Sequence, residues 1–164
     1  MKNKILVVLL IIIALLMIFL YIGDGAAKSE GNEYDGTVLY VLANQLNGRY
    51  APRKTGIIEA LFDKGAPVKA TGRWSKDMLW IEVYGGECGT VWCKAEYLSE
   101  ITDPIIMENS SNGRIKIRSK PGKNGRIVGY VKRDQKITVN QIVLGWGRTK
   151  KGWIDLLYFS EVND

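Results

Sequence analysis

The pattern of apolar and polar positions divides this chain into an apolar front and a long body of short alternating segments. Residues 5–22 carry no charged side chain. As a helix they would span about 27 Å, close to the thickness of a bilayer core. Lys2 and Lys4 precede this segment, and mainly acidic residues follow it. Because lysines favour the cytoplasmic side, the pattern predicts a single-pass signal anchor with the rest of the chain outside the cell membrane.

A cleavable signal peptide is the alternative interpretation of the same segment. Gly25, Ala26 and Ala27 supply the small residues that a signal peptidase requires, but such peptides usually have a shorter apolar stretch of about 7 to 15 residues. As an anchor, the front would comprise a cytoplasmic tip (1–4), a transmembrane helix (5–22) and an acidic linker (23–35). As a signal peptide, it would leave a secreted protein after cleavage near Ala27.

The body of the chain consists of short segments in which apolar and polar residues alternate. Residues 114–118 and 136–139 show this period of two, and turn sequences such as Pro121-Gly122 bound them. No amphipathic helix fits between these segments. Short strands at this spacing predict an all-β body of small antiparallel barrels.

The body also repeats itself. Asn47-Gly48-Arg49 recurs as Asn112-Gly113-Arg114, and each copy closes with a Tyr-x-Ser-Glu motif that begins at Tyr97 or Tyr158. The spacing between matched positions is not constant, so the copies differ in loop length, which a duplicated module tolerates. We therefore expect two independent barrels in tandem, residues 36–100 and 111–164, joined by a linker at 101–110.

The second copy resembles a bacterial Src-homology-3-type domain. Residues 115–122 (IKIRSKPG), 128–131 (VGYV), 137–139 (ITV) and 152–154 (GWI) follow one another in the order of that family. The first copy resembles the family more loosely and departs from it at the longer closing hairpin, residues 86–92. The resemblance implies SH3-like barrels that bind rather than catalyse. It also implies partners such as peptidoglycan, its cross-linking peptides or other surface proteins.

The composition argues against catalysis independently of that resemblance. The chain contains no histidine, which excludes Cys-His and Ser-His nucleophile pairs and histidine metal sites. Glu82, Glu87 and Glu96 could in principle form a glycosidase-type carboxylate pair, but they alternate with apolar residues as solvent-facing positions do. We therefore expect no enzymatic activity, no metal and no cofactor.

The two cysteines permit two interpretations. An exported domain meets an oxidising compartment, which favours a bridge between Cys88 and Cys93. Their odd spacing would instead put the two side chains on opposite faces of a continuous strand, so a bridge requires a turn between them.

Aromatic side chains are the first candidate ligand surface. Aromatic rings stack on sugars and hold extended peptides. Trp74, which lies among polar residues, is one candidate contact, and a groove around Tyr130, Trp146 and Tyr158 is another. Core packing is the other interpretation for the tryptophans.

A basic strand face is the second candidate surface. Residues 113–164 contain 12 Lys and Arg against 4 Asp and Glu, net +8, whereas residues 36–100 contain 8 against 7, net +1. Arg114 and Lys116 should project from the face opposite the core, and Lys120 and Lys123 should extend the patch. Such a field attracts polyanions. Outside the membrane, these would be anionic wall polymers or lipid headgroups rather than nucleic acid.

These observations predict a non-catalytic, membrane-anchored surface protein whose barrels bind cell-wall material: peptidoglycan, its peptides or anionic wall polymers. The alternative is an extracytoplasmic adaptor that recruits an exported enzyme or a secretion component through the same surfaces.

Overall fold

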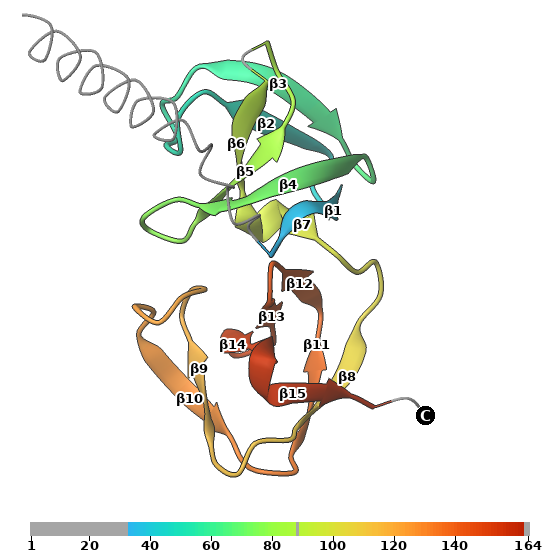
Figure 1. Cartoon of the computed structure of the whole chain (residues 1–164), viewed down its shortest axis with the longest axis vertical. Helices are drawn as coiled ribbons and strands as arrows, with labels where there is room; N and C mark the ends of the chain where they lie inside the picture. The colour runs from blue at the N-terminus through green and yellow to red at the C-terminus, as the bar shows by residue number, and fades with distance from the viewer. Residues whose placement is uncertain (1–32, 88, 163–164) are drawn as a thin grey trace, which may run out of the picture. The chain divides into compact units, whose positions relative to one another are not determined.

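The computed structural model of the chain describes residues 33–87 and 89–162, and residues 33–164 belong to one compact unit (Figure 1). The predicted tip, transmembrane helix and cleavage site lie outside the described residues. Within the described ranges, no helix is long and apolar enough to cross a membrane.

The first part of the compact unit, which we call module 1, is a seven-stranded antiparallel sheet with the strand order β3-β2-β6-β5-β4-β1-β7. A 3-10 helix, η1, precedes the last strand. The elements are β1 (Asp35–Val41), β2 (Gln45–Arg49), β3 (Ile58–Asp63), β4 (Pro67–Trp74), β5 (Trp80–Tyr84), β6 (Thr90–Lys94), η1 (Ala95–Tyr97) and β7 (Leu98–Ser99).

The second part, module 2, contains a five-stranded sheet in the order β10-β9-β14-β13-β12 and a three-stranded sheet in the order β11-β8-β15. A 3-10 helix, η2, again precedes the last strand. The elements are β8 (Ile105–Asn109), β9 (Ile115–Arg118), β10 (Ile127–Val131), β11 (Lys136–Val139), β12 (Gln141–Val143), β13 (Trp146–Arg148), β14 (Trp153–Asp155), η2 (Leu156–Tyr158) and β15 (Phe159–Glu161).

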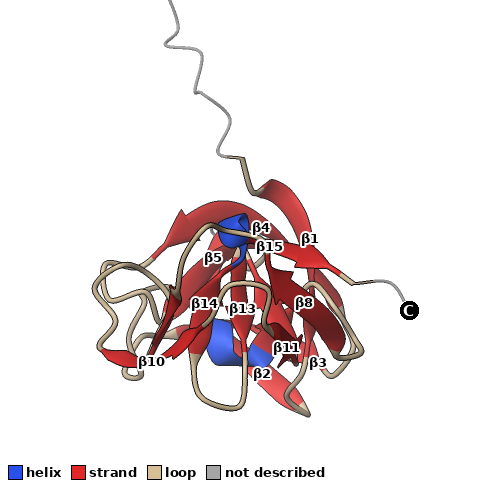
Figure 2. Cartoon of the chain, turned by 90° about the horizontal axis from the view of Figure 1, so that it is seen from below, coloured by secondary structure: helices blue, strands red, loops and turns tan. Residues whose placement is uncertain are grey.

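The predicted all-β architecture is confirmed for the described residues, which form antiparallel sheets and short 3-10 helices but no α-helix (Figure 2). Strand β8 is a difference from the expected organisation, because it lies inside the segment 101–110 that was expected to be a linker. It pairs with β11 on one side and β15 on the other. Both partners follow much later in the chain, so no local pattern marks β8 as the middle strand of a sheet.

The repeat is present in the structure, but its start is shifted relative to the sequence motif. Arg49 of β2 pairs with Trp92, and Arg118 of β9 pairs with Trp153. The Nη1 atom of Arg49 donates to the carbonyl of Gly56 at 2.7 Å, and that of Arg118 to the carbonyl of Gly125 at 2.8 Å. The structural counterpart of Arg49 is therefore Arg118 and not Arg114.

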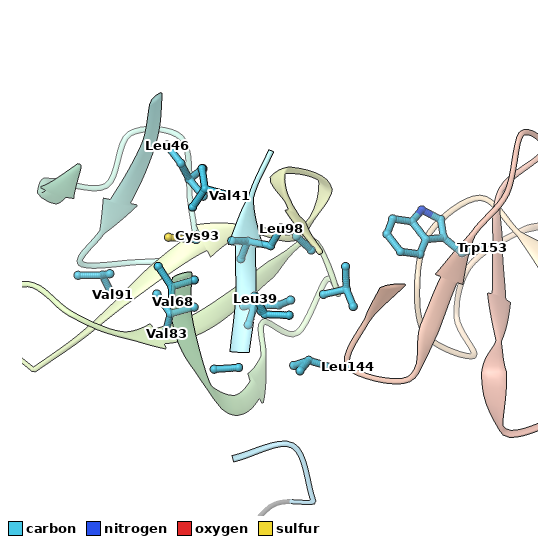
Figure 3. Packing of buried hydrophobic residues seen from close by; sticks show 14 residues of the cluster. Leu39, Val41, Leu46, Val68, Val83, Val91, Cys93, Leu98, Leu144 and Trp153 are labelled. Carbon is cyan, nitrogen blue, oxygen red and sulfur yellow. The ribbon is translucent and has the colours of Figure 1, made fainter. Parts of the chain in front are cut away.

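The two modules share part of their apolar core. One cluster contains buried residues of module 1, among them Leu39, Val83 and Leu98, together with Leu144 and Trp153 of module 2 (Figure 3). A second cluster lies within module 2 and includes Met107, Ile117, Val131, Val139 and Ile154. The modules are therefore packed on each other as well as connected by the chain.

The turn between β12 and β13 is the part of module 2 that enters this shared core. Leu144 and Gly145 both have positive φ, 45° and 80°, and they link the paired residues Val143 and Trp146, as in a two-residue hairpin of type I′. Leu144 is only 2% exposed. Its amide donates to Oε1 of Glu100 at 2.6 Å.

A buried glutamine next to this turn also joins the modules. Nε2 of Gln141 donates to the carbonyls of Ala95 at 2.9 Å and Leu98 at 2.6 Å. Ala95 is the first residue of η1 of module 1, and Leu98 directly follows that helix. The interface therefore combines apolar burial with satisfied polar groups, as a stable contact requires.

Candidate functional site

Five of the eight predicted ligand residues meet at one cavity of module 2, which we call cavity 2. It has a volume of about 250 Å³. The five predicted residues that line it are Arg114, Lys116, Lys123, Trp146 and Tyr158.

Strand geometry explains why these side chains meet. Lys116 lies between Ile115 and Ile117 on β9, and Ile117 is buried in the core, so Lys116 projects the other way. Trp146 begins β13 and pairs with Asp155 of β14, which brings a carboxylate to the same cavity.

Three cations of cavity 2 form no ion pair in the part of the chain that the structure describes. Among the residues that the structure describes, no carboxylate lies within ion-pair distance of Arg114, Lys116 or Lys123. The guanidinium carbon of Arg114 lies 5.0 Å from the ring centroid of Tyr130, a cation–π contact that places this sixth predicted residue beside the cavity.

Two other charged residues of cavity 2 have structural contacts. Arg118 holds the loop after β9 through its bond to Gly125. Oδ1 of Asp155 accepts a hydrogen bond from the amide of Leu157 at 3.2 Å and so caps η2. Tyr158, at the end of η2, is 43% exposed and its ring is accessible to a ligand.

Two predicted ligand residues lie away from cavity 2. Trp74 ends β4 and packs, partly buried, against the core of module 1. Nζ of Lys120 donates to the carbonyl of Asp77 at 2.7 Å and so connects the two modules. The expected basic face therefore stops short of Lys120, because β9 ends at Arg118 and the alternation of side chains ends with it.

A second cavity of about 300 Å³, cavity 1, lies in module 1 and was not predicted. Its lining includes Arg49, Lys54, Trp80, Lys94 and Tyr97. Nζ of Lys94 lies 2.7 Å from Oε1 of Glu96, and this hydrogen bond lowers the pKa of the Glu96 carboxyl. The sequence signal for this cavity is that Trp80 and Tyr97 have counterparts in Trp146 and Tyr158 of the second copy.

Two of the three glutamates considered for catalysis, Glu82 and Glu96, have electrostatic partners in the structure. Glu82 is 6% exposed and accepts hydrogen bonds from Arg73 at 3.0 Å and Thr71 at 2.9 Å, so its charge is compensated inside the sheet. Glu96 is paired with Lys94. In the described part of the chain, no group of three or more potential ligands among His, Cys, Asp and Glu could hold a metal.

Cys93 is a free and fully buried thiol on β6. Burial raises its pKa to about 12, because the thiolate would lose its hydration. It belongs to the apolar core of module 1. Cys88, the other member of the possible bridge, lies outside the described residues.

No protein-family model and no curated protein matches this chain. Among solved structures it is similar to NlpC1 from Trichomonas vaginalis, with 18% identity and a TM-score of 0.33 over 78% of this chain and 47% of that one. It is also similar to NlpC2 from the same organism, with 17% identity and a TM-score of 0.33 over 77% of this chain and 48% of that one. The chain spans about half the length of these two structures, and a likeness at this score carries no information on activity or ligand.

Proposed function

We propose that this chain is a non-catalytic surface protein whose two SH3-like barrels bind cell-wall material. The observation that supports this proposal best is cavity 2, where Arg114, Lys116 and Lys123 are without carboxylate partners among the described residues and stand beside the rings of Trp146 and Tyr158. In this proposal residues 5–22 anchor the chain in the cell membrane, and both modules lie outside.

The chemistry of cavity 2 matches the chemistry of the proposed ligand. Uncompensated guanidinium and ammonium groups attract carboxylates and phosphates, and aromatic rings pack on sugar rings or on the apolar parts of a peptide. Peptidoglycan and its peptides offer carboxylates next to sugar rings and short side chains. Wall phosphopolymers offer the anion alone.

Retention on purified Gram-positive sacculi tests the proposal. We expect the full chain in detergent to be retained, and Lys116→Glu with Lys123→Glu to weaken retention and to reduce its dependence on salt, because exposed charges are screened over about 10 Å at 0.1 M salt. A matched control is Lys132→Glu with Lys136→Glu, which makes the same charge change at exposed positions outside cavity 2.

The outcomes separate the possible ligands. Equal loss in both double variants would show non-specific charge attraction, and unchanged retention in both would exclude cavity 2 as the site. Loss of binding after the phosphopolymer is stripped from the sacculi would identify that polymer, whereas retention on stripped sacculi would identify peptidoglycan. Capture of proteins from wall-free extracts, without binding to sacculi, would favour the adaptor alternative.

A further inference from the structure

Cavity 1 and cavity 2 occupy the same place in their modules. Trp80 lies opposite Lys94 in the β5–β6 pair, as Trp146 lies opposite Asp155 in the β13–β14 pair. Tyr97 ends η1 and Tyr158 ends η2, in each case directly before the last strand of the module.

The loops that carry the cavity lysines also match. The loop with Lys54 is closed by a bond from the amide of Tyr50 to the carbonyl of Ile57, and the loop with Lys123 by a bond from Ser119 to Arg126, both at 2.9 Å. Each loop is further held by the arginine–glycine bond described above. The glycines are needed there, because a Cβ at Gly56 or at Gly125 would collide with a backbone carbonyl of its own loop.

From this correspondence we propose that cavity 1 is a second ligand site of the same kind, and that the residue at position 94 or 155 sets the charge preference of each site. Both cavities contain four corresponding residues, which we call the framework. They are Trp80, Tyr97, Arg49 and Lys54 in cavity 1, and Trp146, Tyr158, Arg118 and Lys123 in cavity 2. This inference rests on the proposed function and specifies its ligand, a wall peptide with a free carboxylate.

The two cavities differ where the framework allows variation. Cavity 2 has Arg114 and Lys116 where cavity 1 has Gln45 and Asn47. It also has the carboxylate of Asp155 where cavity 1 has the ammonium of Lys94, which is already paired with Glu96 at 2.7 Å. No described cation lies within ion-pair distance of Asp155. Cavity 2 therefore takes a peptide that carries a free amine near its carboxylate, whereas cavity 1 takes the carboxylate alone.

The indole N–H signals of Trp80 and Trp146 report on the two cavities separately. The experiment titrates the full chain in detergent with a disaccharide–tripeptide muropeptide that carries free carboxylates and one free amine, and follows both signals by NMR. We expect both to shift with concentration. Tyr97→Ala should weaken the affinity measured at Trp80 about tenfold and leave the affinity measured at Trp146 unchanged. Tyr158→Ala should weaken the affinity measured at Trp146 and leave that at Trp80 unchanged. Both tyrosines are at least 40% exposed, so these variants should remain folded.

The outcomes distinguish this inference from the proposed function. A shift at Trp146 with none at Trp80 would overturn the second site and leave the proposed function standing. No shift at either indole would overturn this inference, and the proposed function would then depend on retention on sacculi through the wall phosphopolymer. If Tyr97→Ala moved the two signals equally, the framework residues would not form separate sites.

The charge preference has its own test at Asp155. Asp155→Asn keeps an oxygen that can cap η2 and removes only the charge. We expect cavity 2 to bind the amine-bearing muropeptide about 3-fold more weakly in this variant, the size typical of an exposed ion pair, and to bind the N-acetylated muropeptide unchanged. Cavity 1 should not distinguish the two muropeptides. Equal effects on both probes at cavity 2 would overturn the role of Asp155.

Discussion

Replacement of Leu144 tests whether docking of the two modules stabilises the fold. Leu144 contributes to the shared core at 2% exposure, and it holds a φ of 45° that L-residues rarely adopt. Leu144→Ala removes the buried side chain but keeps the unfavourable backbone conformation. Leu144→Gly removes the side chain and relieves the backbone.

The two variants should differ in a defined direction. A buried leucine lost to alanine costs about 3 kcal/mol within a range of roughly 2–5, which corresponds to a fall in Tm of roughly 10 °C for a unit of this size. A left-handed conformation costs a non-glycine residue roughly 1–2 kcal/mol. The glycine variant should therefore be about 1 kcal/mol more stable than the alanine variant, the reverse of the order inside a strand or helix.

Urea unfolding monitored by the NMR signals of both modules measures these differences. We expect one cooperative transition for the wild type, with module 1 destabilised by a substitution made in module 2. Asp134 is the control, because it is exposed with a φ of 56°, and its Gly and Ala variants report the backbone effect without burial. An alanine variant that loses less than about 1 kcal/mol, or that leaves module 1 unchanged, would refute the docking argument.

Two further predictions concern buried ionisable groups. Burial raises the pKa of the Glu100 carboxyl, so its contribution to stability is present below its ordinary pKa of 4.5 and is lost as the pH rises through the raised value. Glu100→Gln should therefore increase the free energy of unfolding at pH 7 relative to wild type and not at pH 3, as measured with urea; a loss of stability at pH 7 would contradict this. Cys93, with a pKa of about 12, should resist iodoacetamide at pH 8 in the native protein and react in urea. Mass spectrometry of the Cys93 peptide checks this, and protection that persists in urea without reductant would reveal a bridge.

Local alternation predicted strands β9 and β11 and the outward direction of Arg114 and Lys116 at cavity 2. The period of two around Ile117 determines that Lys116 points away from the core, and this holds wherever β9 is placed in the sheet. Alternation carries no information once a strand ends, which is why Lys120 was misplaced. It is also silent on which strands pair, so it does not distinguish β8 from a linker.

The interface between the modules could not be predicted from the sequence for a different reason. Leu144 occupies a turn, where sequence rules favour polar residues, and its burial depends on an apolar surface formed by distant residues such as Leu39 and Leu98. The Asn-Gly-Arg motif does not lead from cavity 2 to cavity 1, because it aligns Arg49 with Arg114. The hydrogen bonds to Gly56 and Gly125 correct that alignment.

The glutamine at the interface connects the docking of module 2 directly to the turn of cavity 1. Gln141 of module 2 donates to the carbonyls of Ala95, the first residue of η1, and of Leu98, the residue after η1, and this turn carries Tyr97 of cavity 1. If module 2 docked differently with and without its ligand, this contact would carry the difference to Tyr97, and linkage would then require the reverse effect to be equal in size. A polymer bound at one cavity would then change the affinity of the other cavity, so the two cavities would bind the polymer cooperatively.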